Sequence, residues 1–156
     1  MKKGLVALIV AAFAVCFFSL SWAFDEQLAK NYENFFADYS GKNLNVALGM
    51  LEPDDIVKAI IDKKDEIWFL DIRTPLETSI LGMTFKNTLN IPINEVFKSE
   101  NLTKIPTDKT VVLICQKGFR ATAVATALRN IGFNNIKILK GGMVNLIDYL
   151  SFQVLY

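Results

Sequence analysis

The segment VVLICQKGFR, residues 111–120, decides how the rest of the chain is interpreted. Its first five residues are apolar and rich in β-branched side chains, which predicts a strand buried on both faces. The next five contain Gly118 and two cations, and a helical apolar pattern then covers residues 121–131 up to Gly132. A buried strand followed by a short loop and a helix is typical of one β–α unit of a parallel sheet.

The same alternation continues on both sides of this unit. Apolar runs predict further strands at residues 46–48, 67–72, 89–91 and 136–139. Helical spacing predicts helices at residues 25–39, 53–62 and 143–149, with one or two helical turns at 94–98. Because continuous apolar strands separated by helices are buried on both faces, we expect an α/β fold with a central parallel sheet and helices on both faces.

Composition limits the chemistry that is open to this chain. Its 156 residues include 17 Lys plus Arg, 16 Asp plus Glu, and no His. This length predicts one domain with a hydrophobic core, and the balanced charge argues against nucleic acid as a partner. Without His, the chain has no Ser-His-Asp or Cys-His nucleophile and no His-ligated metal, and we expect neither metal nor cofactor. A nucleophile must be activated by other means.

The first 23 residues have the pattern of a secretory signal peptide. Two lysines precede an uncharged run at residues 4–20, and Ala23 ends a small-x-small tripeptide of the kind that signal peptidase cleaves. We expect cleavage near Ala23, export to the periplasm or outside the cell, and no membrane association of the mature chain. The alternative is an uncleaved helix that anchors the protein in a membrane. Cleavage would remove Cys16 and leave Cys115 as the only thiol.

The loop after Cys115 predicts an anion-binding cradle. Ligand crevices in parallel sheets lie outside the carboxyl ends of the strands, and both Asp71 and Cys115 stand at predicted strand ends. A loop with Gly118 lets backbone N–H groups point inward, and the following helix adds its positive end. A cysteine in such a place, near Lys117 and Arg120, can exist as a thiolate without a base. The alternative is an inert, buried cysteine.

Five short motifs occur in an order and spacing typical of one family. They are Asp71-Ile72-Arg73, Asn90-Ile91-Pro92, Cys115 with Arg120 after four residues, Gly132-Phe133, and Leu139-Lys140-Gly141-Gly142. Over about residues 50–149 the chain resembles the single-domain rhodanese family. The resemblance implies a rhodanese-like α/β sandwich, which we place at residues 50–156. The sequence patterns described above place a helical extension at residues 24–49 and the signal peptide at residues 1–23 before it.

The resemblance also implies an activity and a site. The activity is transfer of sulfane sulfur from thiosulfate or a persulfide, through a persulfide on Cys115, to a thiol, a cyanide-like acceptor or a protein. The resemblance assigns the donor-binding cradle to Gln116, Lys117, Gly118, Phe119 and Arg120. Residues 82–89 lack the family's usual Gly-His-Ile-x-Gly-Ala pattern, so we expect substrate access to differ.

Two other functions remain open beside this enzyme. One is a sulfur carrier or partner-binding module that does not turn over, and the other is a phosphatase or arsenate reductase of the same fold. The loop from Cys115 to Arg120 has six residues. That is the length typical of rhodanese-like sulfurtransferases, whereas the related phosphatases have one residue more to admit phosphate. Loop length therefore disfavours the phosphatase.

Asp71 and Arg73 have two interpretations. They are candidates for supporting the anion site, or they form an ion pair that ties the strand end to a neighbouring loop. An aspartate that pointed into the site would repel an anion. The sequence therefore favours the structural role for this pair.

Overall fold

The computed structural model describes residues 23–39, 44–62 and 66–154. The predicted signal peptide lies outside the described residues except for its last residue. The chain divides into two compact units, residues 1–36 and 37–156. None of the helices in the described ranges is long and apolar enough to cross a membrane.

Helix α2, Glu26–Phe36, belongs to the first unit. It covers most of the first predicted helix, and a 3-10 turn at Ala37–Tyr39 takes up the remainder. The ring centroid of Phe36 lies 6.1 Å from that of Tyr32 and 4.9 Å from that of Phe35. The helix predicted at residues 25–39 is therefore confirmed.

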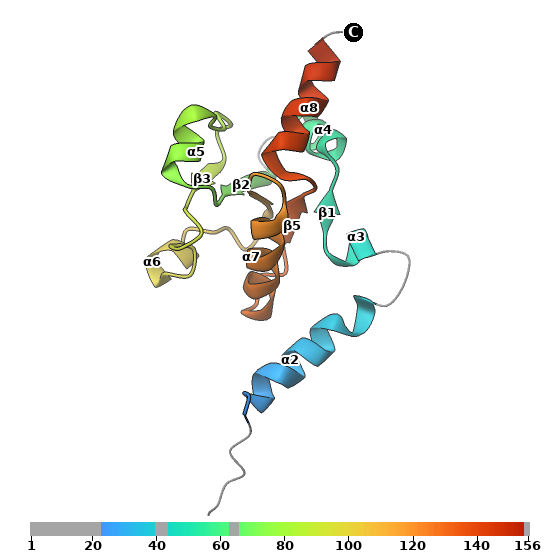
Figure 1. Ribbon diagram of the computed structural model, residues 1–156, viewed down its shortest axis with the longest axis vertical. Helices are drawn as coiled ribbons and strands as arrows, with labels where there is room; N and C mark the ends of the chain where they lie inside the picture. The colour runs from blue at the N-terminus through green and yellow to red at the C-terminus, as the bar shows by residue number, and fades with distance from the viewer. Residues whose placement is uncertain (1–22, 40–43, 63–65, 155–156) are drawn as a thin grey trace, which may run out of the picture. The chain divides into compact units, whose positions relative to one another are not determined.

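The second unit is built around a five-stranded parallel sheet (Figure 1). Its strands are β1 Met50–Leu51, β2 Ile67–Asp71, β3 Thr88–Asn90, β4 Thr110–Ile114 and β5 Ile136–Leu139. Their order is β1-β5-β4-β2-β3, and every neighbouring pair is parallel. The predicted α/β fold with a central parallel sheet is therefore confirmed.

The prediction of a first strand at residues 46–48 is wrong. Residues Leu44–Ala47 form a helical turn, α3, and the strand begins only at Met50. The amide of Leu48 donates to the carbonyl of Leu44 at 2.8 Å, and Gly49 then takes a left-handed φ of 66°. A glycine in this conformation commonly ends a helix, because it has no Cβ to clash. An apolar run this short has no periodicity by which to separate helix from strand.

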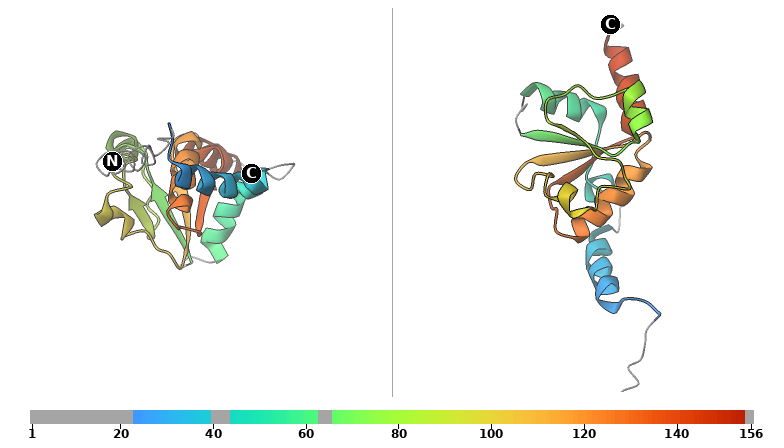
Figure 2. Two further views of the ribbon diagram at one scale, coloured as in Figure 1. Left: turned by 90° about the horizontal axis from the view of Figure 1, so that it is seen from below. Right: turned by 90° about the vertical axis from the view of Figure 1, so that its left-hand side faces the viewer.

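Helices cover both faces of the sheet (Figure 2). In the second unit they are α3, α4 Pro53–Asp62, α5 Pro75–Ile80, α6 Ser99–Leu102, α7 Phe119–Asn130 and α8 Gly142–Val154. Successive residues of β4 point to opposite faces, so Leu113 packs in the core under α7 whereas Val112 packs in the core under α4 and α8. Helix α5 is not among the helices predicted from the sequence.

The strand order brings two candidate residues to the same place on the carboxyl edge of the sheet. Asp71, the last residue of β2, is the register partner of Ile114, the last residue of β4. The amide of Ile72 donates to the carbonyl of Ile114 at 2.9 Å, so the pairing continues past the strand end. Cys115 therefore leaves the sheet next to Asp71.

Candidate active site

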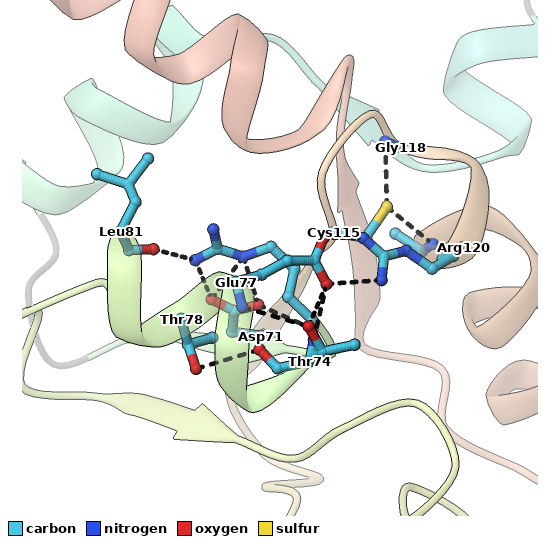
Figure 3. Close-up of polar contacts among 10 residues, drawn as sticks. Asp71, Thr74, Glu77, Thr78, Leu81, Cys115, Gly118 and Arg120 are labelled. Atoms are coloured by element: carbon cyan, nitrogen blue, oxygen red, sulfur yellow. Dashed lines mark hydrogen bonds and ion pairs between the residues drawn. The ribbon is translucent and has the colours of Figure 1, made fainter.

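The sulfur of Cys115 is enclosed by the loop that follows β4 (Figure 3). The Cys115 side chain is only 1% exposed. The Gly118 amide donates to Sγ at 3.1 Å, and the Ala121 amide, in the first turn of α7, does so at 3.4 Å. Gly118 has a left-handed φ of 91°, which turns the loop back over the sulfur. Two backbone donors and a helix N-terminus thus favour negative charge on this atom.

The start of α8 holds the same loop from its other side. The Met143 amide donates to the carbonyl of Cys115 at 2.9 Å, and the Val144 amide donates to the carbonyl of Gln116 at 3.2 Å. A Cβ on Gly142 would lie 2.4 Å from the Cys115 carbonyl oxygen, closer than real Cβ atoms approach. From the sequence, Gly141 and Gly142 were known only as part of the motif Leu139-Lys140-Gly141-Gly142. The close approach of Gly142 to the cysteine loop explains why this position has no side chain.

The side chains of the predicted cradle divide into two groups. Lys117 is exposed, and Phe119 is 81% exposed. Gln116 is half-buried, and the Arg120 side chain is 33% exposed. The structure therefore brings the backbone of the loop and Arg120 to the site, whereas the side chains of Lys117 and Phe119 face solvent.

Arg120 forms an ion pair with Glu77, a residue that the sequence analysis did not single out. Its two terminal nitrogens donate to the two Glu77 carboxylate oxygens, at 3.0 Å and 2.5 Å. These hydrogen bonds, followed by one from the Thr74 amide, lower the pKa of Glu77 to about 2. The pKa of Arg120 is raised, with Glu77 as the largest favourable cause and the Cys115 sulfur as a smaller one. The guanidinium thus interacts with both the carboxylate and the sulfur.

Helix α5 positions Glu77. The Thr74 amide donates to the Glu77 carboxylate at 2.8 Å, and the Glu77 amide donates to the Thr74 hydroxyl at 3.2 Å, which together make a capping box. Pro75 occupies the first turn, where its missing N–H costs nothing. Thr74-Pro75-x-Glu77 is a recognisable helix-start signature, and it is the local signal from which α5 could have been predicted. The pairing of Glu77 with Arg120, 43 positions away, has no such local signal.

Asp71 and Arg73 form a second ion pair, which is buried. Arg73 Nε donates to Asp71 Oδ1 at 2.9 Å, and a terminal nitrogen donates to Oδ2 at 2.6 Å. The same terminal nitrogen donates to the Leu81 carbonyl at 2.8 Å. The two side chains are 0% and 1% exposed. The pair thus ties the end of β2 to the segment after α5, as its structural interpretation expected.

A cavity adjoins the cysteine loop. Its volume is about 400 Å³, and it is lined by Arg73, Glu77, Ile80, Leu81 and Gln116. Gln116 belongs to the cysteine loop, and the other four residues belong to α5 and its flanks. Among the residues that the structure describes, no group of three or more Cys, Asp or Glu side chains is placed to hold a metal ion.

Comparison with known families agrees with this geometry. Residues 53–148 match the family model of the rhodanese-like domain, which is more than half of the chain. The chain belongs to the rhodanese-like family, and its relatives include sulfurtransferases.

Individual relatives are distant. The probable adenylyltransferase/sulfurtransferase MoeZ of Mycobacterium tuberculosis is 27% identical over 114 residues, which are 73% of this chain but 29% of that protein. The mitochondrial thiosulfate sulfurtransferase RDL2 of Saccharomyces cerevisiae is 28% identical over 101 residues, 58% of this chain and 66% of that protein. The crystal structure of a rhodanese-related protein from Thermoplasma volcanium is 26% identical, has a TM-score of 0.52, and covers 64% of this chain and 91% of that one. The chain therefore spans less than a third of MoeZ.

Proposed function

We propose that this protein is a sulfurtransferase in which Cys115 carries sulfane sulfur as a persulfide. The observation that supports it best is the pair of backbone amides, of Gly118 and Ala121, that donate to the cysteine sulfur. Hydrogen-bond donors that are already in place stabilise the charge that develops during a reaction without reorganising. The Arg120 guanidinium adds a fixed positive charge to the same site.

The reaction has two half-reactions. The Cys115 thiolate attacks the outer sulfur of thiosulfate or of a persulfide. The sulfur–sulfur bond of the donor breaks, sulfite or a thiolate leaves with the bonding electron pair, and the outer sulfur stays on Cys115. A thiol or cyanide-like acceptor then attacks this outer sulfur and regenerates the Cys115 thiolate, which predicts ping-pong kinetics.

No step of this scheme needs a side-chain base. The reacting form of Cys115 is the thiolate, whose charge the Gly118 and Ala121 amides stabilise, and the departing sulfite or thiolate leaves as an anion. This agrees with a chain that contains no His. The main contribution of the site to catalysis is therefore the stabilisation of anions by backbone amides.

The test is the intact mass of the purified protein before and after incubation with thiosulfate and with a persulfide donor. We expect the mass of one added sulfur atom, removed by cyanide or by a thiol. Cys115→Ser should gain no sulfur, because a serine hydroxyl neither ionises at neutral pH nor holds sulfane sulfur. If neither donor adds sulfur to the native protein, the proposal is wrong. Loading without turnover by any small acceptor would identify a sulfur carrier that serves a partner protein.

We propose in addition that the protein is exported and that a signal peptidase removes residues 1–23. The support is the sequence pattern of two lysines, an uncharged run and a small-x-small site ending at Ala23. N-terminal sequencing of the protein from the extracytoplasmic fraction should begin at Phe24. An intact N-terminus in the membrane fraction would instead identify an uncleaved anchor.

A further inference from the structure

A second cavity lies on the face of the sheet that α4 and α8 cover. Its volume is about 390 Å³, and its walls are α4, α8 and residues 81–85. None of residues 115–120 lines it, and Cys115 packs in the core under the other face of the sheet. The cavity is therefore separate from the proposed site of sulfur transfer.

The lining of this cavity is apolar. Among the residues that the structure describes, twelve line it, none of these is charged, and Thr84 is the only one with a polar side chain. Met143 and Leu146 are almost completely buried, whereas Ile61 is 66% exposed and Leu150 is 43% exposed. An apolar ligand in the cavity would remove this exposed surface from water, which is favourable.

Contacts between side chains hold the walls of the cavity in place. Helices α4 and α8 lie side by side (Figure 1), and the Tyr149 hydroxyl of α8 donates to the Asp54 carboxylate of α4 at 2.7 Å. Phe85 packs edge-on against the buried Phe69, with their ring centroids 5.3 Å apart. The cavity is thus largely formed before a ligand binds, as is typical of sites for small molecules.

One wall of the cavity belongs to the segment that departs from the family pattern. Gly82, Met83, Thr84 and Phe85 line the cavity, and Met83 stands where the pattern has its histidine. Methionine is a flexible apolar side chain that adapts its shape to a ligand, and Met143 of α8 adds a second one. The apolar character of this wall is therefore a property of this chain's own sequence.

The chemistry of the lining distinguishes between three kinds of occupant. A peptide segment laid in the cavity would lose the hydrogen bonds of its backbone to water, and Thr84 is the only side chain there that could replace one. A charged group would lose its hydration without gaining an ion pair. A hydrocarbon chain makes neither demand. We propose that this cavity binds the hydrocarbon chain of a small amphiphile whose polar end stays in water.

The test is the binding of N-phenyl-1-naphthylamine to the purified protein. This uncharged probe becomes fluorescent in apolar surroundings. We expect one saturable site per chain, from which straight-chain alcohols displace the probe. From 1-hexanol to 1-decanol, each added methylene should tighten binding about fourfold, the effect of burying one methylene. No saturable binding of the probe, or displacement that does not depend on chain length, would overturn the proposal.

Two variants locate the probe in this cavity. Leu150→Asp adds a charge at an exposed lining residue and should weaken binding about tenfold or more. Thr84→Trp adds bulk to the wall without adding charge and should also weaken binding. The matched control is Leu76→Asp, at an exposed leucine of α5 that does not line the cavity, which should bind as the native protein does.

The variants also make the proposal independent of sulfur transfer. If Leu150→Asp and Thr84→Trp, both still folded by thermal melting, bind the probe as the native protein does, the proposal is wrong. Should one of them not fold, the other decides. Cys115→Ser should bind the probe unchanged, so a failure of the sulfurtransferase proposal leaves this site in place.

Other occupants give different results in the same assays. A dimer in sedimentation equilibrium that saturating 1-decanol leaves intact, without displacement of the probe, would show that a second copy covers the cavity. Co-sedimentation with phosphatidylcholine vesicles without binding of 1-decanol would show docking on a membrane surface. Both results would overturn the proposal. Binding of 1-decanol by a protein that stays off the vesicles supports a free amphiphile, and binding of both supports the acyl chain of a lipid.

Discussion

The two arginine–carboxylate pairs beside Cys115 have similar geometry and different surroundings. Asp71 and Arg73 are two positions apart in the chain and are almost completely buried. Glu77 and Arg120 are 43 positions apart, and their side chains are 28% and 33% exposed. Each pair is held by hydrogen bonds from two guanidinium nitrogens to two carboxylate oxygens.

This difference in exposure decides what each pair contributes. Breaking a buried pair by removing one partner leaves an uncompensated charge in a medium of low polarity, which costs about 3–5 kcal/mol. A partly exposed pair is screened by water and contributes about 0–1 kcal/mol to stability. The buried pair is therefore important for the fold, whereas the exposed pair acts mainly through the charge and position of Arg120 next to the sulfur.

The largest expected loss of stability follows from breaking the buried pair of Asp71 and Arg73. Arg73→Met should lower the free energy of unfolding by about 3–5 kcal/mol, because Asp71 loses its partner and stays buried. Denaturant unfolding followed by circular dichroism measures this. The double variant with Asp71→Asn should recover part of the loss, since no buried charge is left unpaired. A single-variant loss below about 1 kcal/mol would show that the two pairs are equivalent.

A smaller loss of unfolding free energy is expected from Gly142→Ala. This substitution disturbs the cysteine loop but contacts neither arginine–carboxylate pair. The new Cβ would lie 2.4 Å from the Cys115 carbonyl oxygen, and the residue has a φ of 66°. We expect a loss of about 1–3 kcal/mol of unfolding free energy, together with slower sulfur loading. Gly132→Ala is the matched control, because it has a φ of 108° but no atom within 4 Å of the added Cβ. If both variants lose the same unfolding free energy, backbone strain alone explains the effect, and the contact with the Cys115 carbonyl contributes nothing.

Arg120→Ala should separate stability from activity. We expect a loss of at most about 1 kcal/mol in unfolding free energy, because the pair with Glu77 is partly exposed. The rate of sulfur loading on Cys115 should fall about 100-fold, the scale of losing one donor to developing charge. Removal of the cation also leaves the Glu77 carboxylate uncompensated near the sulfur. A variant that loads at the native rate would show that the backbone amides suffice.

The smallest effect is the response of the exposed pair to pH. The pKa of Glu77 falls from 4.5 to about 2 in the folded protein, chiefly through hydrogen bonds from Arg120. The stabilisation is therefore fully present above about pH 4.5 and is lost as the pH falls toward about 2. The difference in unfolding free energy between the native protein and Glu77→Gln should shrink across this interval. A difference that stays constant with pH would contradict the depressed pKa.

The sequence predicted the central β–α unit because its signals are local. The apolar run ending at Ile114, the glycine at 118 and the helical spacing that follows lie within a few residues of one another. The same holds for the Asp71–Arg73 pair, whose members are two positions apart. By contrast, the strand predicted at residues 46–48 was a helical turn, because three apolar residues fit either structure.

What the sequence alone determined is therefore the class of fold, the place of Cys115 at the end of a strand and the loop of backbone donors after it. The tertiary structure decided which charges surround the sulfur. It brought Glu77 of α5 to Arg120, and it placed Gly142 of α8 against the carbonyl of Cys115. The physical reason is that ion pairs and close approaches between distant segments depend on strand order and helix packing, which leave no pattern of spacing in the chain.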